Sequence, residues 1–251
     1  MHTCLPAHTC LVVPHYEQVD AFERFVPLLG ATGLVVYVVD DGSATESRKR
    51  CEVACREAGS NVHFLAHALN RGKGAAVYTG TAAAALAGFT HIVQIDADGQ
   101  HDLTDLEALI ELAAQHPTAI VSGLPVFGED APRSRVHGRK VTTAMIAIET
   151  LGGGIKDGLC GYRVYPVAAL QALQDHFHIA PRMGFDTDVL VKARWLNMPV
   201  LFVPTAIVYP AEGRSHFHYL HDNLRLIRLH LGLLAGALLR APAMLWHRWG
   251  V

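Results

Sequence analysis

The feature that most constrains the fold of this 251-residue chain is an alternation between short apolar runs and longer helical patterns. The apolar runs, rich in β-branched residues, fall at residues 10–13, 34–39, 62–66, 91–95 and 119–122. Segments with helical spacing of apolar residues lie between them, at 17–29, 45–58, 75–87 and 103–114. Strands that are apolar on both faces and alternate with helices predict a mostly parallel sheet covered by helices on both sides. The expected fold class is therefore α/β.

The second half of the chain has a less regular pattern. A helix is expected over residues 136–151, followed by a glycine-rich turn at 152–154. A further helix and strand are expected at 186–195 and 200–203. We expect this half to supply one side of a binding site.

The last stretch, residues 216–249, is an apolar helical pattern with a break expected near Pro242. A membrane-spanning helix needs about 20 mostly apolar residues, and Arg225, Arg228 and Arg240 interrupt this run. The pattern therefore predicts an amphipathic helix rather than a span. Arginine and tryptophan beside an apolar face suit a helix lying in the membrane interface. A helix packed on protein has the same pattern, so both alternatives stay open.

The composition is that of a globular protein, with 51% hydrophobic and 18% charged residues. A net charge of -2 gives no overall basic field, which disfavours nucleic-acid binding. Five scattered cysteines predict reduced thiols rather than a disulfide framework. The N-terminus shows no signal-peptide pattern, so a cytoplasmic protein is expected.

Polar residues gather directly after four of the expected strands. These segments are 14–17, 40–43, 70–74 and 96–100. In open parallel sheets, ligands bind beyond the carboxyl ends of the strands. We therefore expect all four segments to meet at one edge of the sheet.

The chemistry at this edge centres on Asp96 and Asp98, which flank one small residue after an apolar strand. Both carboxylates can converge on a hard cation such as Mg²⁺ or Mn²⁺, with phosphate and water oxygens completing the coordination. Gln100 is a further candidate ligand. An Asp-x-Asp-Gly sequence also occurs in calcium loops, but the acidic series of such a loop is absent here.

Asp40 and Asp41 are adjacent carboxylates at another strand end, where one of them could accept a hydrogen bond from a nucleobase N–H. Asp-Gly turns are common, so this signal is weak by itself. Residues 70–74 are not a Walker phosphate loop, because Gly74 follows Lys73 where serine or threonine is required. No G-x-G-x-x-G follows the first strand, which disfavours a dinucleotide-binding domain.

The order of these motifs resembles the inverting family-2 glycosyltransferases of the glycosyltransferase A (GT-A) fold, in the branch that contains dolichol-phosphate mannose synthases. The resemblance covers residues 9 to about 217, and glycosyltransferases of aryl-polyene pathways look similar as well. The matching segments are 12–17, 39–43, 70–75, 95–101, 161–163 and 184–186. Each segment alone is modest evidence, but six in the same order are specific.

The resemblance implies roles for individual residues. Pro14, Tyr16, Glu17 and Asp41 are expected to hold the nucleoside, with Lys73 close to it. Asp96, Asp98 and Gln100 are expected to bind the metal and the donor diphosphate, and Asp40 is a further donor-binding candidate. The family commonly has Asn-Glu after its tyrosine, where this chain has Glu17-Gln18.

The expected acceptor site departs from that branch. Prenyl-phosphate transferases carry arginines where this chain has Pro125 and Pro210, and their Gly-x-Ser-Lys signature ends here in Ser215 and His216. Losing two phosphate-holding cations favours a hydroxyl or carboxylate acceptor, which needs a general base. Asp186 and Asp188 are the catalytic candidates. The acceptor-binding candidates are Arg133, Arg135, Arg139, Arg163, Ser215 and His216, and the three arginines of 133–139 also suit a solvated loop.

The sequence therefore predicts one GT-A-type glycosyltransferase domain at residues 9–217 and a C-terminal amphipathic helical extension at 218–251. The expected activity is metal-dependent inverting transfer from a UDP- or GDP-sugar to a lipid-like acceptor, in the cytoplasm or peripherally on the cytoplasmic face of the membrane. A polyprenyl-phosphate acceptor, a nucleotidyltransferase and a nucleotide-sugar-binding protein without turnover are the alternatives. The oligomeric state stays open.

Overall fold

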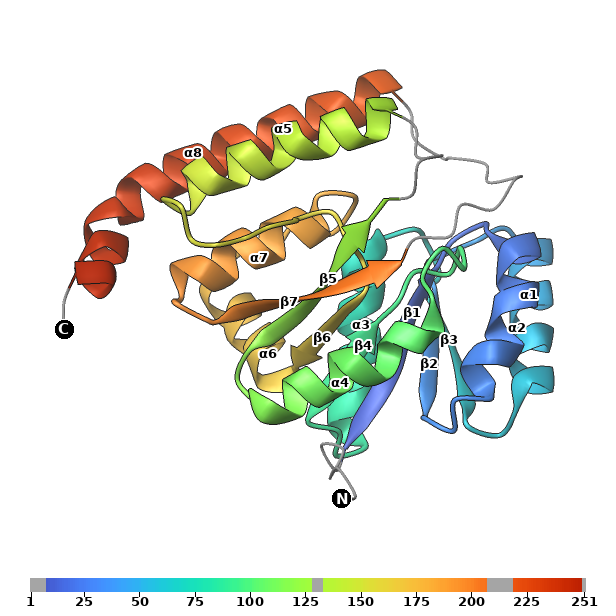
Figure 1. The fold of residues 1–251 in the computed structure, drawn as a ribbon. Helices are drawn as coiled ribbons and strands as arrows, with labels where there is room; N and C mark the ends of the chain where they lie inside the picture. Colours follow the sequence, from blue (N-terminus) through green and yellow to red (C-terminus); the bar gives the residue numbers. More distant parts are fainter. Residues whose placement is uncertain (1–7, 128–132, 207–218, 250–251) are drawn as a thin grey trace.

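The computed structural model describes residues 8–127, 133–206 and 219–249, which form a twisted sheet with helices on both faces (Figure 1). The strand order is β3-β2-β1-β4-β6-β5-β7, and among these strands β6 runs antiparallel to both of its neighbours. This architecture confirms the expected α/β fold with a mostly parallel sheet. The strands are β1 (Thr9–His15), β2 (Val36–Asp40), β3 (Val62–Ala66), β4 (His91–Gln94), β5 (Ile120–Val126), β6 (Arg163–Pro166) and β7 (Val200–Ala206).

Two apolar clusters lie on the two faces of the sheet, because successive side chains of a strand point to opposite faces. Leu11 and Val13 pack with α1 (Val19–Gly30), α2 (Thr45–Ala58) and α4 (Leu106–Gln115), which follows the 3₁₀ turn η1 (Leu103–Asp105). Cys10 and Val12 pack on the opposite face. The helices there are α3 (Lys73–Leu86), α5 (Arg133–Glu149), α6 (Val167–His176), α7 (Phe185–Trp195) and α8 (Tyr219–Trp249).

The structure adds two elements that the sequence pattern does not predict, β6 and α6. With four residues, β6 is too short for a clear period-2 pattern. The expected break near Pro242 was wrong, since α8 continues through this proline to Trp249. Pro242 lies on the exposed side of the helix, where water can replace the missing backbone hydrogen bond.

One face of α8 packs on the domain, alongside α5 (Figure 1). Leu233 and Ala237 are buried there, and His230 Nδ1 lies 2.7 Å from Glu149 Oε1. By length and composition alone, Leu224–Leu245 is apolar enough to cross a membrane, although only 11% of it is buried in the fold. The composition therefore does not exclude a span, contrary to what was expected from the interrupting arginines.

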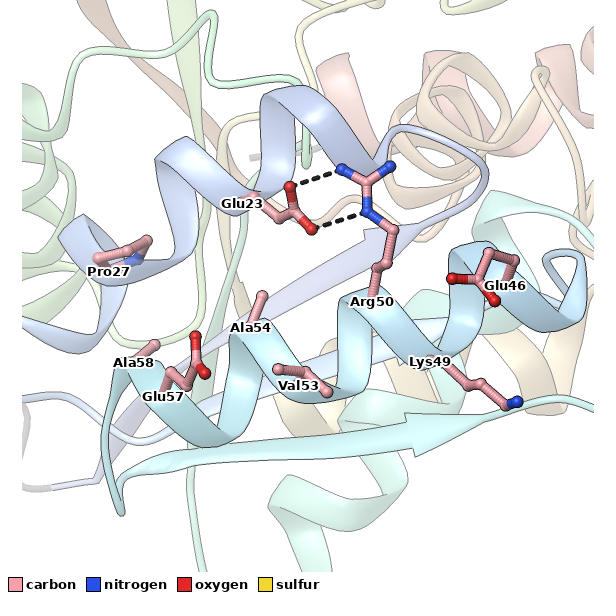
Figure 2. Close-up of a pocket in the computed structure, with 9 residues that line it drawn as sticks. All are labelled: Glu23, Pro27, Glu46, Lys49, Arg50, Val53, Ala54, Glu57 and Ala58. Carbon is pink, nitrogen blue, oxygen red and sulfur yellow. Dashed lines mark hydrogen bonds and ion pairs between the residues drawn. The ribbon is translucent and has the colours of Figure 1, made fainter.

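A shallow surface groove lies between α1 and α2 (Figure 2). Arg50 of α2 crosses it and donates to Glu23 of α1 from Nε (2.9 Å) and Nη2 (2.6 Å). Exposed ion pairs of this kind contribute little stability. No residue of the four polar strand-end segments lines this groove, so it is separate from the expected site.

Candidate active site

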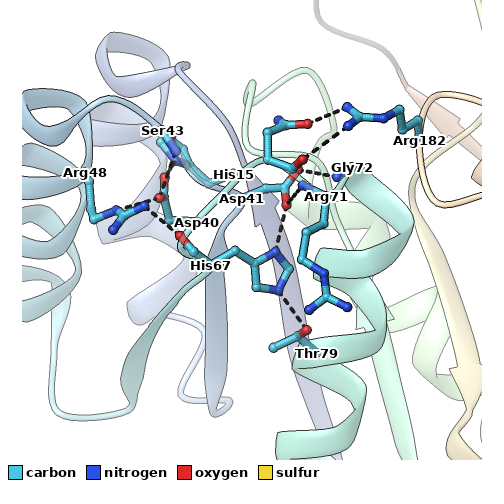
Figure 3. Close-up of polar contacts among 11 residues, drawn as sticks. His15, Asp40, Asp41, Ser43, Arg48, His67, Arg71, Gly72, Thr79 and Arg182 are labelled. Atoms are coloured by element: carbon cyan, nitrogen blue, oxygen red, sulfur yellow. Dashed lines mark hydrogen bonds and ion pairs between the residues drawn. The ribbon is translucent and has the colours of Figure 1, made fainter.

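Asp40, the last residue of β2, holds the first part of the site together (Figure 3). Its Oδ1 lies 3.0 Å from His15 Nδ1, and its Oδ2 accepts hydrogen bonds from Ser43 N (3.1 Å) and Arg48 Nε (3.2 Å). Burial acts to raise the pKa of Asp40, but the hydrogen bonds from His15 and Ser43 outweigh it and lower the pKa. The carboxylate therefore stays ionised inside the protein.

Asp41 binds the loop that precedes α3 (Figure 3). Its Oδ1 accepts from Arg71 N (2.9 Å) and contacts His67 Nδ1 at 2.7 Å, and its Oδ2 accepts from Gly72 N (2.6 Å). Gly42 follows at φ +76°, where a Cβ would collide with the backbone of residues 69 and 70. This turn is thus fixed against the 70–72 loop.

Both aspartates differ from the expected role as direct nucleoside contacts. Asp40 is 0% exposed and Asp41 is 1% exposed, and every carboxylate oxygen already has a protein partner. In this arrangement the two carboxylates hold the surrounding loops and do not face solvent. We therefore treat them as residues that position the surrounding loops.

Asp40→Asn is expected to lower the free energy of unfolding at neutral pH by about 2 kcal/mol, because charge-assisted hydrogen bonds are lost. The folded pKa of Asp40 is depressed, so its stabilisation is present above the unfolded pKa and is lost as pH falls through the folded pKa. Urea unfolding of wild type and variant should therefore converge in acid. Asp20→Asn, with a side chain 80% exposed, is the control and should change little at any pH. Equal destabilisation by Asp40→Asn at all pH values would contradict the ionised state.

The end of β1 and the residues directly after it form the rim beside this network. Tyr16 is 42% exposed, which leaves its ring available to stack on a nucleobase. Glu17 is held by α2 instead, because its carboxylate accepts hydrogen bonds from Ala44 N and from Ser47 Oγ (2.7 Å). Pro14 lies within β1, in register with Val39. Tyr16 is thus the most exposed of these three expected nucleoside contacts.

The centre of the site is the ammonium group of Lys73, the first residue of α3. Its Nζ lies 2.7 Å from Asp96 Oδ1 and 2.6 Å from Asp186 Oδ2. Gln94 Nε2 donates to the other oxygen of Asp186 at 2.9 Å. Burial acts to lower the pKa of Lys73, but Asp186 and Asp96 outweigh it and raise the pKa, so the group stays charged. We call Lys73, Asp96 and Asp186 the lysine junction.

Asp96 and Asp98 follow β4 and lie at the partly exposed edge of the lysine junction. Burial acts to raise the pKa of Asp96, but the charges of Lys73 and His101 lower it overall. Burial, with the charge of Asp96 as the second cause, raises the pKa of Asp98 to about 6. Two hard oxygen ligands that repel each other fit a divalent cation, which would relieve that repulsion.

The described residues supply only part of a metal coordination sphere. They contain no group of three or more histidine, cysteine, aspartate or glutamate residues arranged to hold an ion. Gln100 contributes a backbone contact, its N–H donating to Asp98 Oδ1 at 3.0 Å. A metal held by Asp96 and Asp98 would therefore need oxygens from a bound phosphate and from water.

Arg163 lies beneath the site and not in it. It is 0% exposed, and its guanidinium donates to Tyr165 Oη (3.0 Å), Asp186 O (2.6 Å) and Gly158 O (3.1 Å). This placement corrects the expectation of direct acceptor contact, because the guanidinium has no surface on which an acceptor could bind. Arg163 instead fixes the backbone at Asp186.

The structure separates the two catalytic candidates. Asp186 is in the lysine junction, whereas Asp188 is 0% exposed, accepts from Ala180 N (2.6 Å) and pairs with Lys192 (2.6 Å). The fully used carboxylate of Asp188 is not available as a base, so Asp186 is the better candidate.

The acceptor-side arginines are only partly described. Arg139 pairs with Asp157 and lies over the ring of Phe127, so its charge is already balanced. Arg133 and Arg135 belong to the first turn of α5, and their side chains lie outside the described part of the chain. Ser215, His216 and Pro210 lie in the segment 207–218, also outside the described residues.

Sequence reasoning missed Gln94, which orients Asp186 from within the sheet. Its signal was present in the sequence, because Gln94 stands between the apolar residues Val93 and Ile95, and in the structure its side chain is fully buried. Buried polar side chains are hydrogen-bonded in native structures. A glutamine in such a run therefore indicates a nearby polar partner.

The chain is similar to known proteins over most of its length. The family model "Glycosyl transferase family 2" matches residues 10–173. A dolichyl-phosphate beta-glucosyltransferase of Dictyostelium discoideum is 28% identical over 174 residues, covering 66% of this chain and 52% of the relative. An undecaprenyl-phosphate mannosyltransferase of Micrococcus luteus is 24% identical over 208 residues, covering 81% and 85%. This chain thus spans about half the length of the dolichyl-phosphate relatives, such as 52% of the first.

The fold is also found among solved structures. Glucosyl-3-phosphoglycerate synthase from Mycobacterium tuberculosis, in complex with Mn²⁺, UDP-glucose and glycerol 3-phosphate, superposes with a TM-score of 0.65. The match covers 92% of this chain and 79% of that one, at 16% identity. An identity this low establishes a common fold and nothing further.

Proposed function

This chain belongs to glycosyl transferase family 2 and is a glycosyltransferase, and we propose that it moves a sugar from a nucleotide-diphosphate donor to a lipid-like acceptor. The observation that carries this proposal is the lysine junction. Lys73 joins Asp96, on the expected donor side, to Asp186, on the expected acceptor side. The reacting atoms of donor and acceptor would meet beside this ammonium group.

On the donor side, Tyr16 stacks on the nucleobase and the turns fixed by Asp40 and Asp41 surround the nucleoside. The diphosphate lies against Lys73, whose charge opposes the negative charge that develops on the leaving group. Fixed positive charge in a site with little water is worth more than the same charge in solvent. The reaction is a single in-line displacement at the anomeric carbon, with inversion.

Asp96 and Asp98, as hard oxygen ligands, would hold Mg²⁺ or Mn²⁺ together with the diphosphate. A divalent cation at this position supplies Lewis-acid stabilisation of the leaving group. Support comes from the neighbouring structure solved with Mn²⁺ and UDP-glucose. Metal dependence and a UDP-sugar donor are therefore part of the proposal.

For the acceptor we propose a polyprenyl phosphate. The relatives named above act on dolichyl phosphate and undecaprenyl phosphate, which supports this class over the hydroxyl or carboxylate expected from the sequence. A phosphate oxygen is already an anionic nucleophile and needs no base. This agrees with Asp186, whose oxygens are bound by Lys73 and Gln94 and are poorly placed to take a proton.

A hydroxyl-bearing lipid is the second candidate. Pro125, in the exposed half of β5, supplies no cation where prenyl-phosphate transferases of this branch carry arginine. In that case Asp186 would have to accept the proton of the acceptor. The two candidates therefore predict different consequences of neutralising Asp186.

Asp186→Asn is expected to change transfer to undecaprenyl phosphate by less than about tenfold, because no base is required for that acceptor. The measurement is the rate of sugar transfer from UDP-glucose and GDP-mannose to undecaprenyl phosphate and to long-chain alcohols. A hydroxyl acceptor would instead be preferred by the wild type and lose about 10²- to 10⁴-fold in the variant. That second pattern would replace the phosphate acceptor while leaving the glycosyltransferase assignment intact.

A further inference from the structure

The outward side of α8 is an apolar face that no described part of the chain covers. Leu238 and Leu239 are 78% and 82% exposed. The other members of this face recur at helical spacing and are also exposed: Leu224, Ile227, Leu231 and Leu245. The last turns of α8 also project beyond the rest of the fold (Figure 1). A face of this length marks an interaction surface.

A pocket lies beside this face, where α8 meets α7 and the end of α6. We call it the seam pocket. Its wall is formed by Phe177, Trp195 and Lys192 from the domain side and by Arg228, Gly232 and Arg240 from α8. Gly232 leaves the space open, because a Cβ there would meet no atom within 4 Å. The opening is therefore built into α8.

The seam pocket carries net positive charge. Lys192 is neutralised by Asp188 at 2.6 Å. Arg240 lies over the rings of Phe177 (5.1 Å) and Trp195 (4.8 Å) and donates to Gly236 O, a backbone carbonyl. Arg228 is exposed, and within the described ranges neither Arg228 nor Arg240 has a carboxylate partner. Two arginine charges thus face the opening.

We propose that the seam pocket binds the phosphate of an anionic phospholipid while α8 lies in the membrane interface. Cationic side chains beside an apolar helix face match the arrangement of lipid phosphates above acyl chains. The two features are continuous, since Arg228 and the neighbouring Ile227 belong to the same turn of α8. Arg240 is held in place by its two aromatic neighbours, so its guanidinium is preorganised for an anion.

The packing of α8 against the rest of the fold argues against a helix that spans the bilayer. Leu233 and Ala237 are buried against the domain, and the contact between His230 and Glu149 ties the middle of α8 to α5. A spanning α8 would have to break all of these contacts and take the arginines into hydrocarbon. A helix lying on the surface keeps them.

The first test is co-sedimentation of the intact protein with phosphatidylcholine vesicles, with and without phosphatidylglycerol. Wild type should bind the anionic vesicles more tightly. Arg228→Gln should weaken this binding about fivefold, since each basic residue near an anionic surface contributes about 1 kcal/mol. Arg56→Gln removes the same charge from an exposed site on α2 and should have little effect. Equal losses in both variants would mean that only net charge matters, which overturns the pocket.

The second test places charge inside the pocket. Gly232→Glu should weaken binding to anionic vesicles at least fivefold, whereas Gly232→Gln, of the same size, should weaken it less. Helix content and the melting temperature of both variants are measured as controls for correct folding. Identical binding by the two variants would contradict an anion site at the seam.

A soluble anion is the competing occupant, and inorganic phosphate distinguishes it. Phosphate that raises the melting temperature of wild type but not of Arg228→Gln, with no binding to vesicles, would assign the pocket to a soluble ligand and overturn the lipid assignment. Vesicle binding that survives excess phosphate supports it.

Discussion

Replacing Asp98 by asparagine is expected to lower sugar transfer about a thousandfold while leaving the fold intact. The variant keeps the size and the backbone contact of the side chain but removes a charge from the proposed metal pair. Burial and Asp96 already raise the pKa of Asp98 to about 6. Ionising Asp98 therefore costs more free energy in the folded protein than in the unfolded chain. Removing that charge should not lower the free energy of unfolding.

Asp102→Asn is the matched control, because Asp102 lies in the same loop and its carboxylate accepts from Thr104 N at 2.9 Å, at the start of η1. Transfer should be nearly unchanged in this variant. Rates are measured with Mg²⁺ or Mn²⁺ and again in excess chelator, together with thermal melting. Full activity of Asp98→Asn, or activity of wild type in chelator, would remove the metal from the proposal.

Most strands of the sheet were predictable because each is a short apolar run, rich in β-branched residues, between two helical segments. The expected strand at residues 62–66 and helix at 45–58 agree with β3 and α2 at both ends. The strand-end rule also holds for Lys73 and Asp96, which meet at the carboxyl edge of the sheet. The place of β6 between β4 and β5 has no such local signal, since strand order depends on contacts distant in sequence.

The direction in which a carboxylate points was not predictable. Asp40 and Asp41 are neighbours at a strand end, yet one turns to His15 and Arg48 and the other to His67 and the loop before α3. Adjacent side chains of an extended chain point in opposite directions, which separates the two carboxylates. The hydrogen-bond partners of the two carboxylates depend on the conformation of loops, which the sequence pattern does not define.

The link between Lys73 and Asp186 was hidden for the same reason, because 113 residues separate them. It requires α7 to lie tightly against α3. Gly74 permits this approach, since a Cβ there would press into the ring of Phe185. A glycine one residue after the lysine thus brings Asp186 within reach.

Lys73→Gln is expected to lower transfer about a hundredfold, the smaller end of the effect of losing one electrostatic donor in an active site. Without the ammonium group, Asp96 and Asp186 would face each other and the diphosphate with no balancing charge. Lys73→Arg keeps the charge and should retain more activity than Lys73→Gln. Lys49→Gln is the control, because Lys49 is an exposed lysine in the groove between α1 and α2 (Figure 2).

A double-variant cycle separates coupling through the lysine junction from a general loss of charge. If Lys73 acts by balancing Asp186, then neutralising Asp186 as well removes the charge that Lys73→Gln left unbalanced. Lys73→Gln with Asp186→Asn should then recover about tenfold over Lys73→Gln alone, which corresponds to a coupling of at least about 1.4 kcal/mol, because any loss in Asp186→Asn by itself adds to this value. Strictly additive losses in kcat/KM would show that the two side chains act independently. In that case Lys73 would serve the diphosphate alone, and the junction would not link donor and acceptor.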